Sequence, residues 1–154
     1  MRNKLFKRVG VGGTFDTIHT GHIRLISEAL RHGENVIIAI TSDEFARKLK
    51  PYTPRPFPER LIRLKILVEK IARNENVSFE KLNDKYGSAV RDPDMDAIVV
   101  SIETLPTAFE INEQRVLRGL QPLHIVVIPL VKDGHGEKFS SRLVRRFIEE
   151  YGIL

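Results

Sequence analysis

The chain has 154 residues, of which 42% are hydrophobic and 29% are charged. That length suits a single domain with its own core, and that composition excludes intrinsic disorder for most of the chain. Cysteine is absent, which excludes disulfides, zinc–thiolate sites, iron–sulfur clusters and thiol nucleophiles.

The formal net charge is +5, with 25 basic residues mixed among 20 acidic ones and few aromatic side chains. This mixture favours a small anionic ligand over nucleic acid, whose binding surfaces concentrate basic residues and interleave aromatic ones. The longest apolar runs fall far short of the ~20 residues of a membrane span, and no secretion signal follows the basic first residues. We therefore expect one cytoplasmic domain, residues 1–154, without a nucleic-acid or membrane partner; the sequence leaves its oligomeric state open.

Apolar runs typical of strands alternate with segments of helical periodicity. In chain order they predict strand 8–12, helix 21–31, strand 35–40, helix 58–72, strands 77–82 and 97–100, helix 107–117, strand 124–128 and helix 140–151. The continuous β-branched run 35–40 is typical of a buried parallel strand, and the more alternating run 77–82 suits a position nearer an edge. This alternation predicts a doubly wound, Rossmann-like α/β fold with a five-stranded parallel sheet.

Sheets of this kind bind ligands beyond the carboxyl ends of their strands, so the turns that follow the strands are the candidate site. The first turn, Gly12 to His22, begins with two glycines that let a ligand approach the backbone. His19 and His22 are three residues apart and face the same way at the start of a helix, where Gly21 leaves the phosphate-attracting N-terminus open. The turn matches neither the dinucleotide fingerprint nor a phosphate-binding Walker loop.

Two plainer interpretations of the histidines remain open from the residues alone. His19 and His22 are spaced to bind a metal ion, although no cysteine or third histidine stands nearby. They are also compatible with ordinary histidines in the first turn of a helix.

A longer motif connects this turn to a known superfamily. The run Gly13-Thr14-Phe15-Asp16 followed by His19-Thr20-Gly21-His22 resembles the GTFDxxHxGH signature of the nucleotidyltransferases. Near the end of the chain, Ser140-Ser141-Arg142-Leu143-Val144-Arg145 resembles their Ser-Ser-Thr-x-Ile-Arg element, with arginine in place of the threonine. The resemblance implies that the serines and one arginine hold ATP phosphates, and it leaves open which arginine does so.

The middle of the chain resembles one branch of that superfamily. Residues 84–93 and 98–104 are similar to the D-x-Y-G-x-A-x-x-D-P…V-V-S-x-E-T pattern of archaeal phosphopantetheine adenylyltransferases and of the adenylyltransferase domain of eukaryotic coenzyme A synthase. This resemblance implies transfer of the adenylyl group of ATP to 4′-phosphopantetheine, giving 3′-dephospho-coenzyme A and pyrophosphate. Two alternatives are a nucleotidyltransferase acting on nicotinamide mononucleotide, FMN or glycerol phosphate, and a nucleotide-binding module without catalytic activity.

The resemblance also implies residue roles. The expected catalytic residues are His22, His19, Thr14 and Lys48. The expected ATP-binding residues are Gly12, Gly13, Thr14, Phe15, His22, Ser101, Ser140, Ser141, Arg142 and Arg145. Acceptor binding is expected from Lys48, Lys50, Asn112 and Arg115, and the sequence does not decide between the two lysines. Mg²⁺ is expected to arrive bound to ATP, with no ligand from the protein.

Overall fold

The computed structural model describes residues 4–129. In chain order its elements are β1 (Phe6–Gly13), α1 (Thr20–His32), β2 (Gly33–Thr41), α2 (Asp43–Leu49), α3 (Phe57–Ile71), β3 (Asn76–Leu82), the 3-10 helix η1 (Gly87–Val90), β4 (Ala97–Ser101), α4 (Leu105–Leu117) and β5 (His124–Ile128). The five strands form one sheet in the order β3-β2-β1-β4-β5, and every neighbouring pair is parallel. The doubly wound parallel sheet expected from the sequence is confirmed, and β3 is at an edge.

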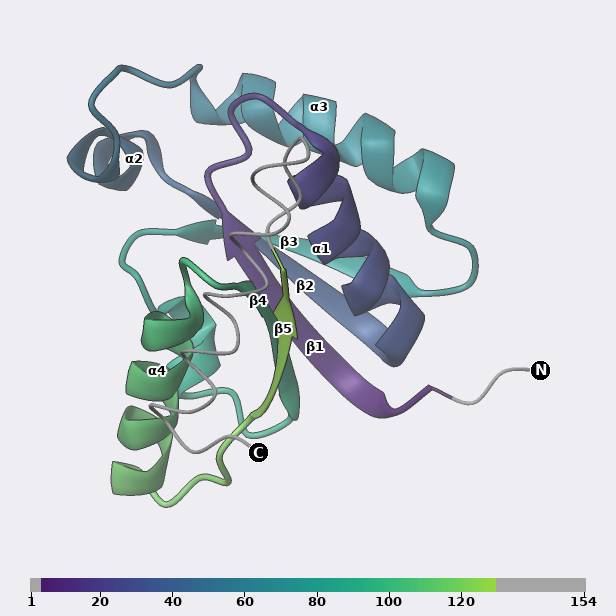
Figure 1. Ribbon diagram of the computed structural model, residues 1–154, viewed down its shortest axis with the longest axis vertical. Coiled ribbons are helices and arrows are strands. Elements are labelled where there is room, and N and C mark those ends of the chain that lie inside the picture. Colours follow the sequence, from purple (N-terminus) through teal and green to yellow (C-terminus); the bar gives the residue numbers. More distant parts are fainter. Residues whose placement is uncertain (1–3, 130–154) are drawn as a thin grey trace.

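Helices cover the sheet on both faces (Figure 1). On one face, Ile26 of α1 and Leu64 of α3 pack against Val9 and Val11 of β1 in the main core. On the other face, Ala108 of α4 packs in a smaller cluster with residues at the end of β4. Burial of these apolar side chains is the main driving force for bringing the layers together.

One helix was not expected from the sequence. Residues 43–49 form α2, which is capped by the Ser42 hydroxyl accepting the Phe45 amide and has Asp43 and Glu44 in its first turn. A helix of two turns is too short to show the apolar periodicity of a helix in its sequence, so only the capping residues indicate it. The helix expected at 140–151 lies outside the described residues, and among the residues described none forms a helix long and apolar enough to cross a membrane.

Candidate active site

The sheet order creates a switch point between β1 and β4. After Gly13, β1 leads to α1 on one face of the sheet, whereas after Ser101, β4 leads to α4 on the other. Because the two connections diverge, a crevice is expected at the carboxyl ends of these strands. Gly12, Gly13 and Ser101 therefore lie at the edge of the sheet where the sequence predicted a nucleotide, and the Ser101 amide donates to Thr104 Oγ1 at 3.2 Å.

The turn after β1 is built around a buried phenylalanine. Phe15 has φ of +52°, in the left-handed region, and its side chain is 1% exposed. A Cβ at Gly13 would lie 3.1 Å from the Phe15 ring, so glycine at this position lets the ring fold beneath the turn. The Phe15 ring belongs to the core and supports the turn from below, so the expected contact with ATP stays a prediction for the backbone of Phe15 rather than its side chain.

The two histidines cap α1 reciprocally. His19 is the N-cap residue, and its Nδ1 accepts the Gly21 amide at 3.1 Å. The His19 amide donates in turn to His22 Nδ1 at 3.3 Å, and the two rings stack with centroids 3.8 Å apart. The His22 ring also lies 5.0 Å from the Phe15 ring, centroid to centroid. The capping bonds hold both imidazoles at the positive end of the helix dipole, where an anion is favoured.

This environment keeps His22 uncharged at neutral pH. The pKa of His22 is lowered from 6.5 to about 4, chiefly by burial and also by the charges of His19 and Lys50, while a hydrogen bond to the Thr17 backbone acts in the opposite direction. Since Nδ1 accepts the His19 amide, the neutral ring carries its proton on Nε2, which can donate a hydrogen bond. His22 is thus suited to act as a neutral hydrogen-bonding group beside a phosphate.

The structure distinguishes the two candidate lysines. Lys50 follows α2 as its C-cap residue, and its charge acts on His22. Lys48 lies exposed in the last turn of α2, and no contact described for residues 4–129 joins it to the histidines. Both lysines are exposed, and only the effect of Lys50 on the pKa of His22 favours Lys50 for the cationic role that the sequence assigned first to Lys48.

Thr14 lies between the ends of β1 and β2. Its side chain is 8% exposed, and its hydroxyl accepts a hydrogen bond from the Thr41 hydroxyl at 3.2 Å. The Thr14 hydroxyl keeps its own proton for a further acceptor. Its position beside the crevice is compatible with the expected contact to a phosphate.

Arg115 is buried away from the candidate site. Its side chain is 1% exposed, and its guanidinium donates to the carbonyls of Gln121, Ala89, Asp92 and Met95 at 2.7 to 3.2 Å. These carbonyls precede β4 and β5, at the amino ends of the strands and so at the opposite edge of the sheet from the histidines. The expected acceptor contact stays a prediction that the structure does not support, because all three nitrogens of the guanidinium already donate to loop carbonyls.

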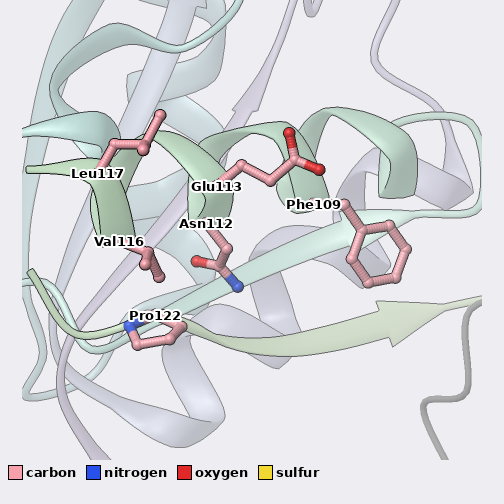
Figure 2. A pocket seen from close by; sticks show the side chains of 6 residues that line it. All are labelled: Phe109, Asn112, Glu113, Val116, Leu117 and Pro122. Atoms are coloured by element: carbon pink, nitrogen blue, oxygen red, sulfur yellow. The ribbon is translucent and has the colours of Figure 1, made fainter.

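Asn112 has a similar structural role. Its amide donates to the Leu123 carbonyl at 3.0 Å, and its side-chain oxygen accepts the Leu123 amide at 2.7 Å. It also lines a hollow between α4 and the segment that leads into β5, beside Val116 and Pro122 (Figure 2). That hollow is mostly apolar and gathers no cations, so it does not fit a phosphorylated acceptor, and the expected acceptor contact of Asn112 has no support.

The sequence analysis missed a charged residue behind the site. Arg60 of α3 is fully buried and donates to Thr14, Thr41, Asp43 and Arg55. A signal was present, because position 60 lies four residues before Leu64 and eight before Val68, on the apolar stripe of the helix. A charged residue on such a stripe predicts a buried group with several partners.

Within residues 4–129, no group of three or more histidine, aspartate or glutamate side chains is arranged to hold a metal ion. The metal interpretation of the histidine pair therefore lacks a third ligand among the residues described. Ser140, Ser141, Arg142 and Arg145 lie outside those residues.

Comparison with known proteins places the chain in a family. A model of the cytidylyltransferase-like family matches residues 11–147. Phosphopantetheine adenylyltransferase from Methanopyrus kandleri is 48% identical over 145 residues, covering 94% of this chain and 92% of the relative. The enzyme of the same name from Pyrobaculum aerophilum is 45% identical over 144 residues, covering 94% and 93%.

Solved structures agree on the fold. A protein with unknown function from Archaeoglobus fulgidus superposes with a TM-score of 0.72 at 32% identity, covering 79% of this chain and 88% of that one. A bifunctional NMN adenylyltransferase/ADP ribose pyrophosphatase from Francisella tularensis has a TM-score of 0.59 at 17% identity, covering 89% and 41%. Fold and turn together define the class, a cytidylyltransferase-like α/β protein. Within that class the chain belongs to the phosphopantetheine adenylyltransferase family.

Proposed function

We propose that this chain transfers the adenylyl group of ATP to 4′-phosphopantetheine, releasing pyrophosphate and forming 3′-dephospho-coenzyme A. The observation that carries the proposal is the reciprocally capped pair of His19 and His22 at the switch point. It stands in a chain 45% and 48% identical to two enzymes named for this activity.

The reaction is a displacement at the α-phosphorus. An oxygen of the acceptor phosphate forms the new P–O bond, the bond between the α-phosphorus and the bridging oxygen breaks, and the electron pair leaves with pyrophosphate. A phosphate monoester has a second pKa of about 6, so the nucleophile is already a dianion at neutral pH and needs no general base. The substrate is ATP with its Mg²⁺, and catalysis consists of positioning and charge stabilisation.

Residue roles follow from the geometry of the turn. Nε2 of the neutral His22 donates to an α-phosphate oxygen, while His19 keeps that ring in place. Lys50, whose charge acts on His22, supplies positive charge, and the N-terminus of α1 supplies a partial one. A neutral donor beside a cation stabilises negative charge without the cost of placing two like charges together.

The test is pyrophosphate release from ATP with phosphopantetheine, nicotinamide mononucleotide, FMN and glycerol phosphate measured in parallel. We expect turnover with phosphopantetheine alone, and slower turnover when CTP replaces ATP. A preference for another acceptor would contradict the proposed substrate, and no turnover with any of the four would indicate a nucleotide-binding module.

A further inference from the structure

Arg60 is a buried hub between the segments that form the candidate site. Its Nη1 donates to the carbonyls of Thr14 at 3.0 Å and Thr41 at 2.8 Å. Its Nε donates to the Arg55 carbonyl at 2.7 Å, and its Nη2 to Asp43 Oδ1 at 2.9 Å. We propose that Arg60 is a positioning residue for adenylyl transfer, because it fixes the turn that carries His22 relative to the segment that carries Lys50.

The first arm of the hub acts on the histidine turn. The bond from Arg60 fixes the carbonyl of Thr14, and therefore the peptide that leads into Phe15. Phe15 is the residue with left-handed backbone whose ring lies 5.0 Å from His22. A non-glycine residue keeps such a conformation only where its surroundings determine it. Arg60 thus helps to hold the Phe15 ring in its position next to the His22 ring.

The second arm acts on the segment between β2 and α3. Arg60 holds Thr41 at the end of β2 and Asp43 at the start of α2, and through the Arg55 carbonyl it also holds the return from α2 to α3. Lys50 lies between these attachment points. If these hydrogen bonds are lost, the segment no longer holds Lys50 in place, and Lys50 is its cation whose charge acts on His22.

A third contact joins the histidine turn directly to the segment between α2 and α3. The Arg55 amide donates to Asp16 Oδ1 at 2.8 Å, and its guanidinium donates to the Asp16 carbonyl at 2.7 Å. Asp16 follows Phe15 in the turn, so the return segment is bonded directly to the histidine turn as well as through Arg60. The planar fork of arginine reaches four groups at once, which a lysine ammonium on a flexible stem cannot reproduce.

The chain provides a matched control in Arg115. Both arginines are at most 1% exposed, and both donate to several backbone carbonyls. Arg115 lies at the opposite edge of the sheet and touches no segment that carries His22 or Lys50. Arg60→Lys and Arg115→Lys therefore remove comparable sets of hydrogen bonds, one next to the candidate active site and one far from it.

The experiment compares the two lysine variants with the unaltered protein. Thermal melting measures stability, pyrophosphate release at saturating substrates gives kcat per folded molecule, and NMR titration follows the pKa of His22. We expect both variants to melt lower. Only Arg60→Lys should lose kcat, by about 100-fold and by more than its KM for ATP rises, as misplacement of about 1 Å produces. The pKa of His22 should rise toward 6.5 in Arg60→Lys and stay unchanged in Arg115→Lys.

Two results would overturn the inference: a kcat in Arg60→Lys within about threefold of the unaltered protein, or an equal loss in Arg115→Lys. If Arg60→Lys does not fold, Asp43→Ala removes the arm to α2 together with the bond that Asp43 Oδ1 accepts from the Phe57 amide, and an unchanged kcat and His22 pKa in that variant would overturn it too. The inference rests on the proposed function. Without turnover in the unaltered protein the proposed function fails, and the His22 titration still tests the positioning separately.

Discussion

The two ring nitrogens of His22 have separable roles, and two substitutions test them. In His22→Asn the amide oxygen can still accept the His19 amide, whereas the group at Nε2 is lost. We expect kcat to fall by about 10²–10³-fold, as on removal of one transition-state donor, with little change in melting temperature. His22→Gln, which places an amide near Nε2, should recover part of the rate.

His32 is the control histidine, because it lies at the other end of α1 and pairs with Glu28. His32→Asn should leave kcat unchanged. If His22→Asn keeps most of its kcat, the donor role belongs elsewhere in the turn.

Substitution of Lys50 gives a second test at the scale of single residues, in which the pKa of His22 is measured. In Lys50→Met one of the causes that lower the pKa of His22 disappears, so its value should rise above about 4. The same variant should lose at least about tenfold in kcat, because the positive charge proposed to stabilise the transition state is gone. Lys48→Met is the matched control on the same helix. A larger loss in Lys48→Met would restore the role that the sequence first gave to Lys48.

The lowered pKa of His22 also sets a pH dependence of stability. The unfolded chain binds a proton at this histidine near pH 6.5, while the folded protein resists protonation until about pH 4. Between these values the unfolded state binds more protons, so the contribution of His22 to stability falls as the pH falls through this window. His22→Asn should therefore show a weaker loss of melting temperature between pH 7 and pH 4 than the unaltered protein.

At the scale of the element, the start of α1 is shaped by Gly21. A Cβ at this position would lie 2.9 Å from Cε1 and 3.1 Å from Nδ1 of His19. Alanine favours a helix over glycine by about 1 kcal/mol, so Gly21→Ala should hold its melting temperature while it pushes the His19 ring away. We expect at least about a tenfold loss of kcat, since the stacked pair no longer keeps its geometry.

Thr20→Ala is the control for that substitution, because Thr20 is exposed and adjacent. An unchanged rate in Gly21→Ala would show that the position of the His19 ring is immaterial to turnover.

At the scale of the whole molecule, the remaining question is whether the far end of the chain serves the same site. Arg145 lies outside the described residues, and its role rests on the resemblance of residues 140–145 to the second nucleotidyltransferase element. Arg145→Ala should raise the KM for ATP, because a charge-assisted hydrogen bond contributes about 1.5–3 kcal/mol. The measurement is a steady-state titration of ATP, with Arg142→Ala as its partner; the reverse order of effects would assign the phosphate to Arg142.

The sequence by itself determined the architecture and predicted where the candidate site lies. Five apolar runs separated by helical segments dictate a parallel sheet, and ligands of such sheets bind at the carboxyl ends of the strands. The run from Gly13 to His22 is local in the sequence, so its glycines, helix cap and paired histidines could be interpreted without the fold.

Only the tertiary structure decided which side chains are used up in holding the protein together. Arg60 meets the carbonyl of Thr14 across 46 positions of the chain, and Arg115 meets that of Ala89 across 26. The periodicity of the sequence does not show such pairings. Arg115 was therefore expected, from the family resemblance, to bind the acceptor, and Arg60 was assigned no role. The burial of Phe15 and the effect of Lys50 on His22 were hidden for the same reason, because both depend on how distant segments pack. Sequence patterns specify which face of an element is apolar, but the partner of a buried polar group is set by the segments that packing brings against it.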